Sequence, residues 1–167
     1  MSNSSKRVVV FDIDGTLANV SHRLYLVKKE SGEKKNWSAF FAEAKRDKPY
    51  EHILKLNKLY AENGYDIILC TGRPANLRND TLDWLLEHGI VFDLLLMRLA
   101  TDRSPDYECK PRTLLECLPL NGYSLNQIEV VFEDRLSVCE AWRNLGLNVL
   151  VCGDEWRNTK EAKISES

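Results

Sequence analysis

The chain has 167 residues and carries 23 Lys and Arg against 25 Asp and Glu, so its net charge is −2. Hydrophobic residues make up 44% and charged residues 29%, which is ordinary for a globular protein. This length suits one α/β domain better than two. The missing basic excess argues against a protein that coats nucleic acid, although it leaves recognition of a single phosphate open.

The five cysteines form no C-x-x-C pair, which favours reduced thiols and a cytoplasmic location. No signal peptide is recognisable, and no apolar run approaches the length that spans a bilayer. We therefore expect a cytoplasmic protein without a membrane partner.

Strands and helices are predicted to alternate along the chain. Short apolar runs predict strands at 7–12, 65–70, 92–97, 128–132 and 147–152. Apolar residues at helical spacing predict helices at 17–27, 37–44, from Pro49 to Gly64, from Pro74 to Gly89, from Pro111 to Leu118, and at 138–145. This order is typical of βαβ units with right-handed crossovers.

The predicted fold is a Rossmann-like α/β domain with a parallel sheet of about five strands flanked by helices. It occupies residues 7–152, between a flexible tail at 1–6 and a polar tail at 153–167. Residues 17–48 form a small helical insert with eight Lys or Arg against four Asp or Glu. The insert is too short for a large cap, and we interpret it either as a lid beside the site or as a solvated helical face.

Carboxylates follow two of the predicted strands. Asp12 and Asp14 end the first strand, and Glu133 and Asp134 end the fourth. In open parallel sheets, ligand-binding and catalytic residues usually lie beyond the carboxyl ends of the strands. Hard oxygen ligands in small number suit Mg²⁺, and the three isolated histidines offer no zinc cluster. A single carboxylate there could be a helix cap, but four together predict a metal-assisted active site.

Several residues at the same edge are candidates for binding phosphate. Thr71 and Gly72 follow the second strand, where a hydroxyl and backbone N–H groups at the start of a helix can meet a phosphoryl oxygen. Lys110 supplies a positive charge, and Arg23 and Arg73 supply two more. Taken singly, each is also typical of an ordinary turn or a solvated charge.

The order of these residues along the chain matches that of a known family. The stretch from Asp12 to Thr16, then Thr71, Lys110 and Glu133-Asp134, resembles the four motifs of the haloacid dehalogenase-like phosphohydrolases. The resemblance covers residues 7–152. It is closest to the 3′-phosphatase domain of phage polynucleotide kinase-phosphatase and to related stand-alone phage phosphatases. Further matching positions are Arg23, Thr71-Gly72-Arg73, Leu96-Met97-Arg98, Asp106 four residues before Lys110, and Glu133-Asp134-Arg135.

The resemblance implies a role for each matching position. Asp12 would attack phosphorus to give an aspartyl phosphate, and Asp14 would protonate the leaving oxygen and later activate water. Mg²⁺ would be bound by Asp12, by Asp14 through its carbonyl oxygen, and by Asp134. Phosphoryl oxygens would be held by Thr71, Gly72 and Lys110, the substrate phosphate would meet Arg23 and Arg73, and Asp106 would orient Lys110. Glu133, a supporting residue, stands where close relatives usually have Asp.

The predicted function is a Mg²⁺-dependent phosphomonoester hydrolase acting on nucleic-acid 3′-phosphate ends or nucleotides. The alternatives are a mononucleotide or small-metabolite phosphatase, and a receiver-like phosphoacceptor module that does not turn over. No P-loop kinase motif is present, and no obligate protein partner is evident. Trp37, Phe40 and Phe41 are interpreted as the core of the insert or as a surface that stacks a base.

Overall fold

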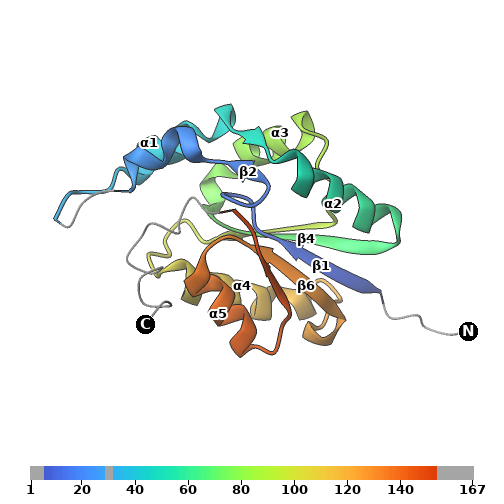
Figure 1. Cartoon of the computed structure of the whole chain (residues 1–167). Coiled ribbons are helices and arrows are strands. Elements are labelled where there is room, and N and C mark those ends of the chain that lie inside the picture. The colour runs from blue at the N-terminus through green and yellow to red at the C-terminus, as the bar shows by residue number, and fades with distance from the viewer. Residues whose placement is uncertain (1–5, 29–31, 154–167) are drawn as a thin grey trace, which may run out of the picture.

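The computed structural model describes residues 6–28 and 32–153. The predicted tails therefore lie outside the described residues, except for Lys6 and Gly153. A five-stranded parallel sheet stands between two layers of helices, which confirms the predicted α/β class (Figure 1). In the described part of the chain, no helix combines the length and the apolar character needed to cross a bilayer.

The sheet consists of β1 (Arg7–Phe11), β4 (Tyr65–Pro74), β5 (Leu94–Arg98), β6 (Ile128–Glu133) and β7 (Val149–Val151). The strand order is β5-β4-β1-β6-β7, and all neighbouring pairs are parallel. The chain extends the sheet in one direction from β1 and then returns to extend it in the other. The strand order therefore reverses beside β1, and in such folds ligands usually bind beyond the carboxyl ends of the strands at this point.

Helices α2 (Glu51–Glu62) and α3 (Arg78–Glu87) cover one face of the sheet, and α4 (Asp106–Leu120) and α5 (Leu136–Asn144) cover the other (Figure 1). The side chains of β1 alternate between these layers because successive residues of a strand point to opposite faces. Val9 and Phe11 belong to the first core and Val8 and Val10 to the second, and all four are fully buried.

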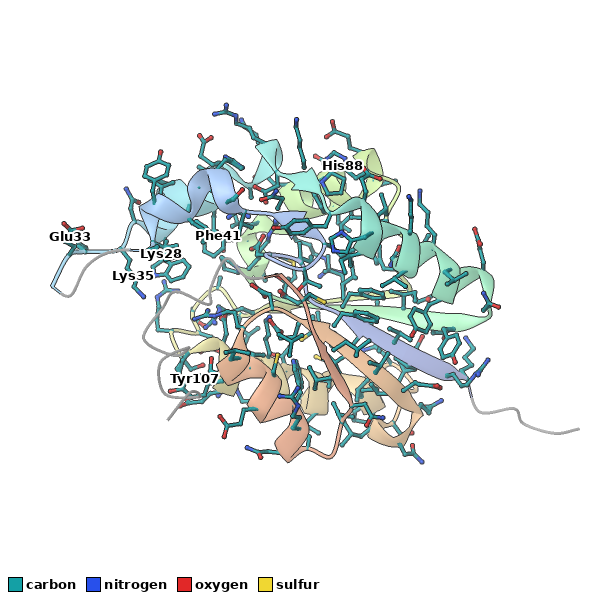
Figure 2. All side chains as sticks on the ribbon, in the orientation of Figure 1. Lys28, Glu33, Lys35, Phe41, His88 and Tyr107 are labelled. Carbon is teal, nitrogen blue, oxygen red and sulfur yellow. The ribbon has the colours of Figure 1, made fainter. Side chains whose placement is uncertain are left out.

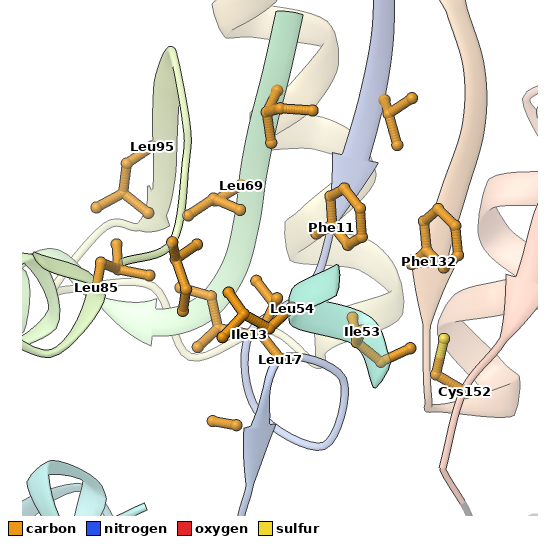
Figure 3. Close-up of a cluster of buried hydrophobic side chains, with 14 of the residues drawn as sticks. Phe11, Ile13, Leu17, Ile53, Leu54, Leu69, Leu85, Leu95, Phe132 and Cys152 are labelled. Atoms are coloured by element: carbon orange, nitrogen blue, oxygen red, sulfur yellow. The ribbon is translucent and has the colours of Figure 1, made fainter. Parts of the chain in front are cut away.

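Phe11 marks the centre of the first core. Its ring stacks on Phe132 of β6, with centroids 4.6 Å apart and planes 5° from parallel (Figure 3). Burying a Phe side chain contributes roughly 1.5–3 kcal/mol relative to exposure. This packing joins β1 to β6 directly below the strand ends that carry the acidic residues.

The two ends of the insert are joined by a short antiparallel strand pair, β2 (Ala18–Asn19) with β3 (Lys48–Pro49). Between them lie the 3₁₀ turn η1 (Ser21–Leu26), helix α1 (Trp37–Ala42) and the turn η2 (Ala44–Arg46). The insert has its own small core of Val20, Leu24, Val27 and Phe40. Both ends of the insert are therefore held close to the carboxyl end of β1.

Several predicted elements differ from the structure. The helix predicted at 17–27 is instead β2 followed by η1, because residues 18–19 pair with the strand at the far end of the insert. Pro49 lies in β3, and α2 begins at Glu51. Strand β4 continues through Pro74, so α3 begins only at Arg78.

Helix α4 was predicted to begin at Pro111, where proline is favoured in a first turn. It begins five residues earlier, at Asp106, with Pro105 as its N-cap. Pro111 therefore lies inside the helix, where its missing N–H costs one backbone hydrogen bond. The earlier start places Lys110 on the helix rather than in the preceding loop.

Candidate active site

Asp12 is the first residue after β1, and its N–H donates to the carbonyl of Phe132 at 3.0 Å. The chain then turns sharply, and the Ile13 carbonyl accepts hydrogen bonds from three N–H groups, those of Thr16, Leu17 and Ala18. This compact loop fixes the backbone between Asp12 and Asp14. The two carboxylates consequently meet different partners.

Lys110 joins two of the carboxylates. Its ammonium donates to Asp12 Oδ1 at 2.7 Å and to Glu133 Oε2 at 2.8 Å. All three side chains are at most 4% exposed. Burial alone lowers the pKa of Lys110, but the charges of Asp12 and Glu133 raise it well above its usual value. Lys110 therefore remains a fixed cation in the site.

Asp134 is a buried carboxylate whose two oxygens have no hydrogen-bond partner. Buried polar groups nearly always find partners, so such a pair of free oxygens points to a ligand that binds them. Gly15 leaves the space that this carboxylate fills, because a Cβ at Gly15 would lie 2.0 Å from Asp134 Oδ2. Gly15 also has a φ of +88°, which side-chain-bearing residues rarely adopt.

The acidic residues together fit a divalent cation. Asp12, Glu133 and Asp134 each bring a carboxylate oxygen within 4.8 Å of the others. Burial and the charge of Glu133 raise the pKa of Asp12 to about 7. Burial and the charges of Asp12 and Glu133 raise the pKa of Asp134 well above its usual value. One lysine does not balance three buried carboxylates, and a hard divalent cation would supply the missing positive charge.

Glu133 differs from Asp134 in that donors surround its carboxylate. Oε1 accepts from the N–H groups of Asp134 and Arg135 at 3.2 and 3.3 Å. Oε2 accepts from Lys110 and, at 3.4 Å, from Trp142 Nε1. The longer Glu side chain thus folds back on its own turn. Because its oxygens already accept these hydrogen bonds, Glu133 is suited to holding Lys110. Asp12 and Asp134 are therefore the better candidates for cation ligands.

Asp14 faces away from the lysine, toward two arginines. Arg23 Nη2 donates to Asp14 Oδ1 at 2.7 Å, and Arg73 Nη2 donates to the same oxygen at 2.6 Å. Arg73 Nε adds a contact to Oδ2 at 3.1 Å. Burial would raise the pKa of Asp14, but the charges of Arg73 and Arg23 and their hydrogen bonds hold it well below its usual range.

The sequence did not indicate Asp47, which completes this arrangement from the far end of the insert. Its carboxylate is fully buried and accepts from Arg23 at 2.8 and 2.5 Å, in a two-pronged ion pair. Arg73 Nη2 lies 3.5 Å from the same carboxylate. The only sequence signal was one acidic residue within a basic segment, which by itself predicts nothing specific.

The Thr71-Gly72 turn lies inside β4, so the predicted helix N-terminus is not beside it. Thr71 is buried, and its hydroxyl accepts from the N–H of Arg73 at 3.2 Å. Gly72 allows close approach of α4, because a Cβ there would lie 2.6 Å from Asp106 Oδ1. The predicted phosphate-binding residue Gly72 is therefore also a packing requirement.

Asp106, the first residue of α4, is held by two arginines. Its carboxylate accepts from Arg98 and, at 2.8 Å, from Arg135. Burial would raise the pKa of Asp106, but the charges of Lys110, Arg135 and Arg98 lower it. Lys110 itself is oriented by Asp12 and Glu133. Asp106 acts on it through charge from one turn earlier on the helix.

The structure thus gathers the predicted site residues at one edge of the sheet, in three contact groups. The first group is Asp12, Lys110, Glu133 and Asp134. The second is Asp14, Arg23 and Arg73, whose N–H also donates to the Thr71 hydroxyl. The third is Gly72 with Asp106. The arginines predicted to meet the substrate phosphate are at most 2% exposed and bind Asp14 and Asp47.

The match to a family model shows that this parallel sheet, with its acidic site beyond β1 and β6, is that of a haloacid dehalogenase-like phosphatase. The chain belongs, more narrowly, to the family described as the polynucleotide kinase PNKP phosphatase domain, which it matches over residues 6–155. The predicted resemblance is confirmed.

Solved structures agree with this assignment. A chain of the Pnkp1/Rnl/Hen1 complex superposes with a TM-score of 0.70 at 27% identity, covering 90% of this chain and 47% of that one. A chain of the Pnkp1/Rnl/Hen1 RNA repair complex gives 0.69 at 28%, covering 91% and 45%. The chain therefore spans about half the length of these two. CbbY from Rhodobacter sphaeroides in complex with phosphate shares the fold, with a TM-score of 0.67 at 16% identity, covering 94% and 91%.

Proposed function

We propose that this protein hydrolyses phosphomonoesters through an aspartyl-phosphate intermediate on Asp12, with Mg²⁺ as its cofactor. The observation that carries the proposal is the division of two neighbouring carboxylates between different surroundings. Asp12 lies with Lys110 and Asp134, whereas Asp14 lies with two arginines. The two carboxylates are therefore not equivalent and can take two different roles, nucleophile and acid/base, at one phosphoryl group.

In the first step, an Asp12 carboxylate oxygen attacks phosphorus, and the bond from phosphorus to the leaving oxygen breaks. Lys110 holds Asp12 Oδ1 at 2.7 Å, which fixes the orientation of the carboxylate and offsets negative charge. A proton from Asp14 passes to the leaving oxygen. In the second step, Asp14 takes a proton from water as the water oxygen attacks the aspartyl phosphate, which releases phosphate and regenerates Asp12.

Asp12 and Asp134 would hold the Mg²⁺, together with the carbonyl oxygen of Asp14. When bound, the ion would supply positive charge to the phosphoryl oxygens, which weakens their repulsion of the attacking carboxylate. The two partnerless oxygens of Asp134 are the observation that supports this placement. Glu133 would keep Lys110 in place rather than bind the ion, because four donors already face its carboxylate.

The substrate we propose is a nucleic-acid 3′-phosphate end or a nucleotide. The family match supports this class, and one of the matched structures is that of an RNA repair complex. Side chains of suitable chemistry lie on the insert: Trp37 is 41% exposed, its ring stacks on Phe41 with centroids 5.9 Å apart, and Phe41 lines a small pocket with Arg73. Phe40, in contrast, is buried in the core of the insert.

Cationic and aromatic side chains of the insert and of α4 lie on the same side of the molecule. Figure 2 shows Lys28, Lys35 and Phe41 on the insert, with Tyr107 at the start of α4 across from them. Tyr107 is 44% exposed. Cationic and aromatic side chains are the groups that bind single-stranded nucleic acid without reading its sequence.

A hydrolysis panel tests the proposal. It compares an oligonucleotide with a 3′-phosphate, the same oligonucleotide with a 5′-phosphate, a nucleoside monophosphate and a sugar phosphate, each with Mg²⁺ and with EDTA. Asp12→Asn serves as the background control. We expect the 3′-phosphate end to be hydrolysed fastest and EDTA to stop the reaction. Preference for the monophosphate or the sugar phosphate would replace the substrate class, and full activity in EDTA would refute the metal site.

A further inference from the structure

The two ends of the insert meet at one buried ion pair beside Asp14. Arg23, from its first turn, and Asp47, from its last residues, are both fully buried. The Arg23 guanidinium also donates to the carbonyl of Phe40 at 3.0 Å and lies 4.0 Å from the centre of its ring. The position of Asp47 therefore depends on how the whole insert closes on the sheet.

Asp47 is anchored on both its backbone and its side chain. Trp84 Nε1 of α3 donates to its carbonyl at 2.9 Å. His22 Nε2 lies 2.8 Å from Asp47 Oδ1, and because a carboxylate only accepts, the imidazole N–H is the donor. The His22 side chain is 36% exposed and stands at the outer end of this chain of contacts. None of these contacts belongs to the phosphoryl-transfer group around Lys110.

The charges in this cluster balance as two against two. Arg23 and Arg73 are each shared between the carboxylates of Asp14 and Asp47, at 2.5–2.7 Å for Arg23 and at 2.6 and 3.5 Å for Arg73. Without the Asp47 carboxylate, Arg23 would lose the two hydrogen bonds that Asp47 accepts from it, and its guanidinium would be held less firmly against Asp14. An acid/base residue must point at the oxygen that it protonates, so the arginines that hold the Asp14 carboxylate also set its direction.

We propose that Asp47, held in place by His22, is a positioning residue that fixes the Arg23–Arg73 pair and so orients the Asp14 carboxylate toward the leaving oxygen. This role rests on the proposed function, because it deepens the acid step of the same reaction. Neither His22 nor Asp47 touches the phosphoryl group. Their effect reaches the reaction only through the arginines.

The test uses two substrates whose leaving groups differ in their need for a proton. 4-Nitrophenyl phosphate releases a stable phenolate without one, whereas the best alcohol-derived substrate of the hydrolysis panel needs protonation. Loss of the acid step therefore slows only the second. His22→Ala keeps the buried ion pairs and removes the hydrogen bond to Asp47. His52→Ala, at an exposed histidine on α2, is the matched control.

For His22→Ala we expect kcat for the alcohol-derived substrate to fall roughly tenfold, a fraction of the 10²–10⁴-fold that acid–base catalysis contributes. The rate with 4-nitrophenyl phosphate should stay within about twofold of wild type. His22→Asn, which can donate from its amide to Asp47, should recover part of the loss. Asp47→Asn should show the same split with a larger loss. If that variant does not fold, the two His22 variants still decide the question.

The proposal and the proposed function fail in different ways. Equal losses for both substrates in His22→Ala, or no loss for either, would overturn the positioning role while leaving the phosphatase intact. Failure of the wild-type protein to hydrolyse either substrate would instead overturn the proposed function itself. A loss in the His52→Ala control equal to that in His22→Ala would also count against a specific role for His22.

Discussion

The partnerless carboxylate of Asp134 yields a prediction about stability that needs no substrate. Replacing it by asparagine keeps its size and removes a buried negative charge near Asp12 and Glu133. The amide is still a buried polar group but carries no charge, and leaving a charged group unsatisfied costs more than the roughly 1–3 kcal/mol that a neutral group costs. In EDTA at pH 7.5 we therefore expect Asp134→Asn to be more stable than wild type by about 1–3 kcal/mol. For a protein of this size, that is roughly 2–12 °C in Tm.

Magnesium should reverse this order. A ligand at 100 times its Kd stabilises the folded state by about 2.7 kcal/mol, and Asp134→Asn should lose most of that gain. Urea unfolding followed by the fluorescence of buried Trp84 and Trp142 measures both quantities, with and without Mg²⁺. Asp83→Asn, at an exposed position on α3, is the control for a surface charge change. Lower stability of Asp134→Asn in EDTA, or an unchanged response to Mg²⁺, would refute the reasoning.

Three further predictions concern Asp12, Asp14 and Gly15. Because the pKa of Asp12 is raised in the folded state to about 7, from near 4 when unfolded, the metal-free protein should lose up to about 4 kcal/mol as pH rises from about 4 to 7. Saturating Mg²⁺ should flatten this slope in urea titrations, and a slope of opposite sign would contradict the assignment. Asp12→Asn should abolish hydrolysis of 4-nitrophenyl phosphate, whereas Asp14→Asn should retain part of it; stopped-time assays would expose the reverse order. Gly15→Ala should unfold the protein or lower its Tm far more than Gly122→Ala, which shares a positive φ but meets no atom within 4 Å.

The overall fold could be predicted from the sequence because its signals are local. A run such as Val8 to Phe11 can be buried only as a strand covered on both faces, and the alternation of such runs with helical spacing implies parallel crossovers. The helix starts were less predictable. Pro49 and Pro111 both suit a first helical turn. Pro49 instead lies in a strand, because its segment pairs with residues 18–19. Pro111 lies inside a helix that begins earlier, at Asp106, where this residue closely approaches Gly72.

By itself, the sequence determined which residues lie at strand ends or on the segments that follow, because motif order and strand alternation are properties of the chain. These residues are Asp12, Asp14, Thr71, Lys110 and Asp134. Only the tertiary structure decided which charges meet. The Asp134 carboxylate lies without a hydrogen-bond partner in the space that Gly15 leaves open. The longer side chain of Glu133 instead reaches back to donors on its own turn. Such pairings join residues far apart in the chain and depend on distances of a few ångströms, which spacing in a sequence does not encode.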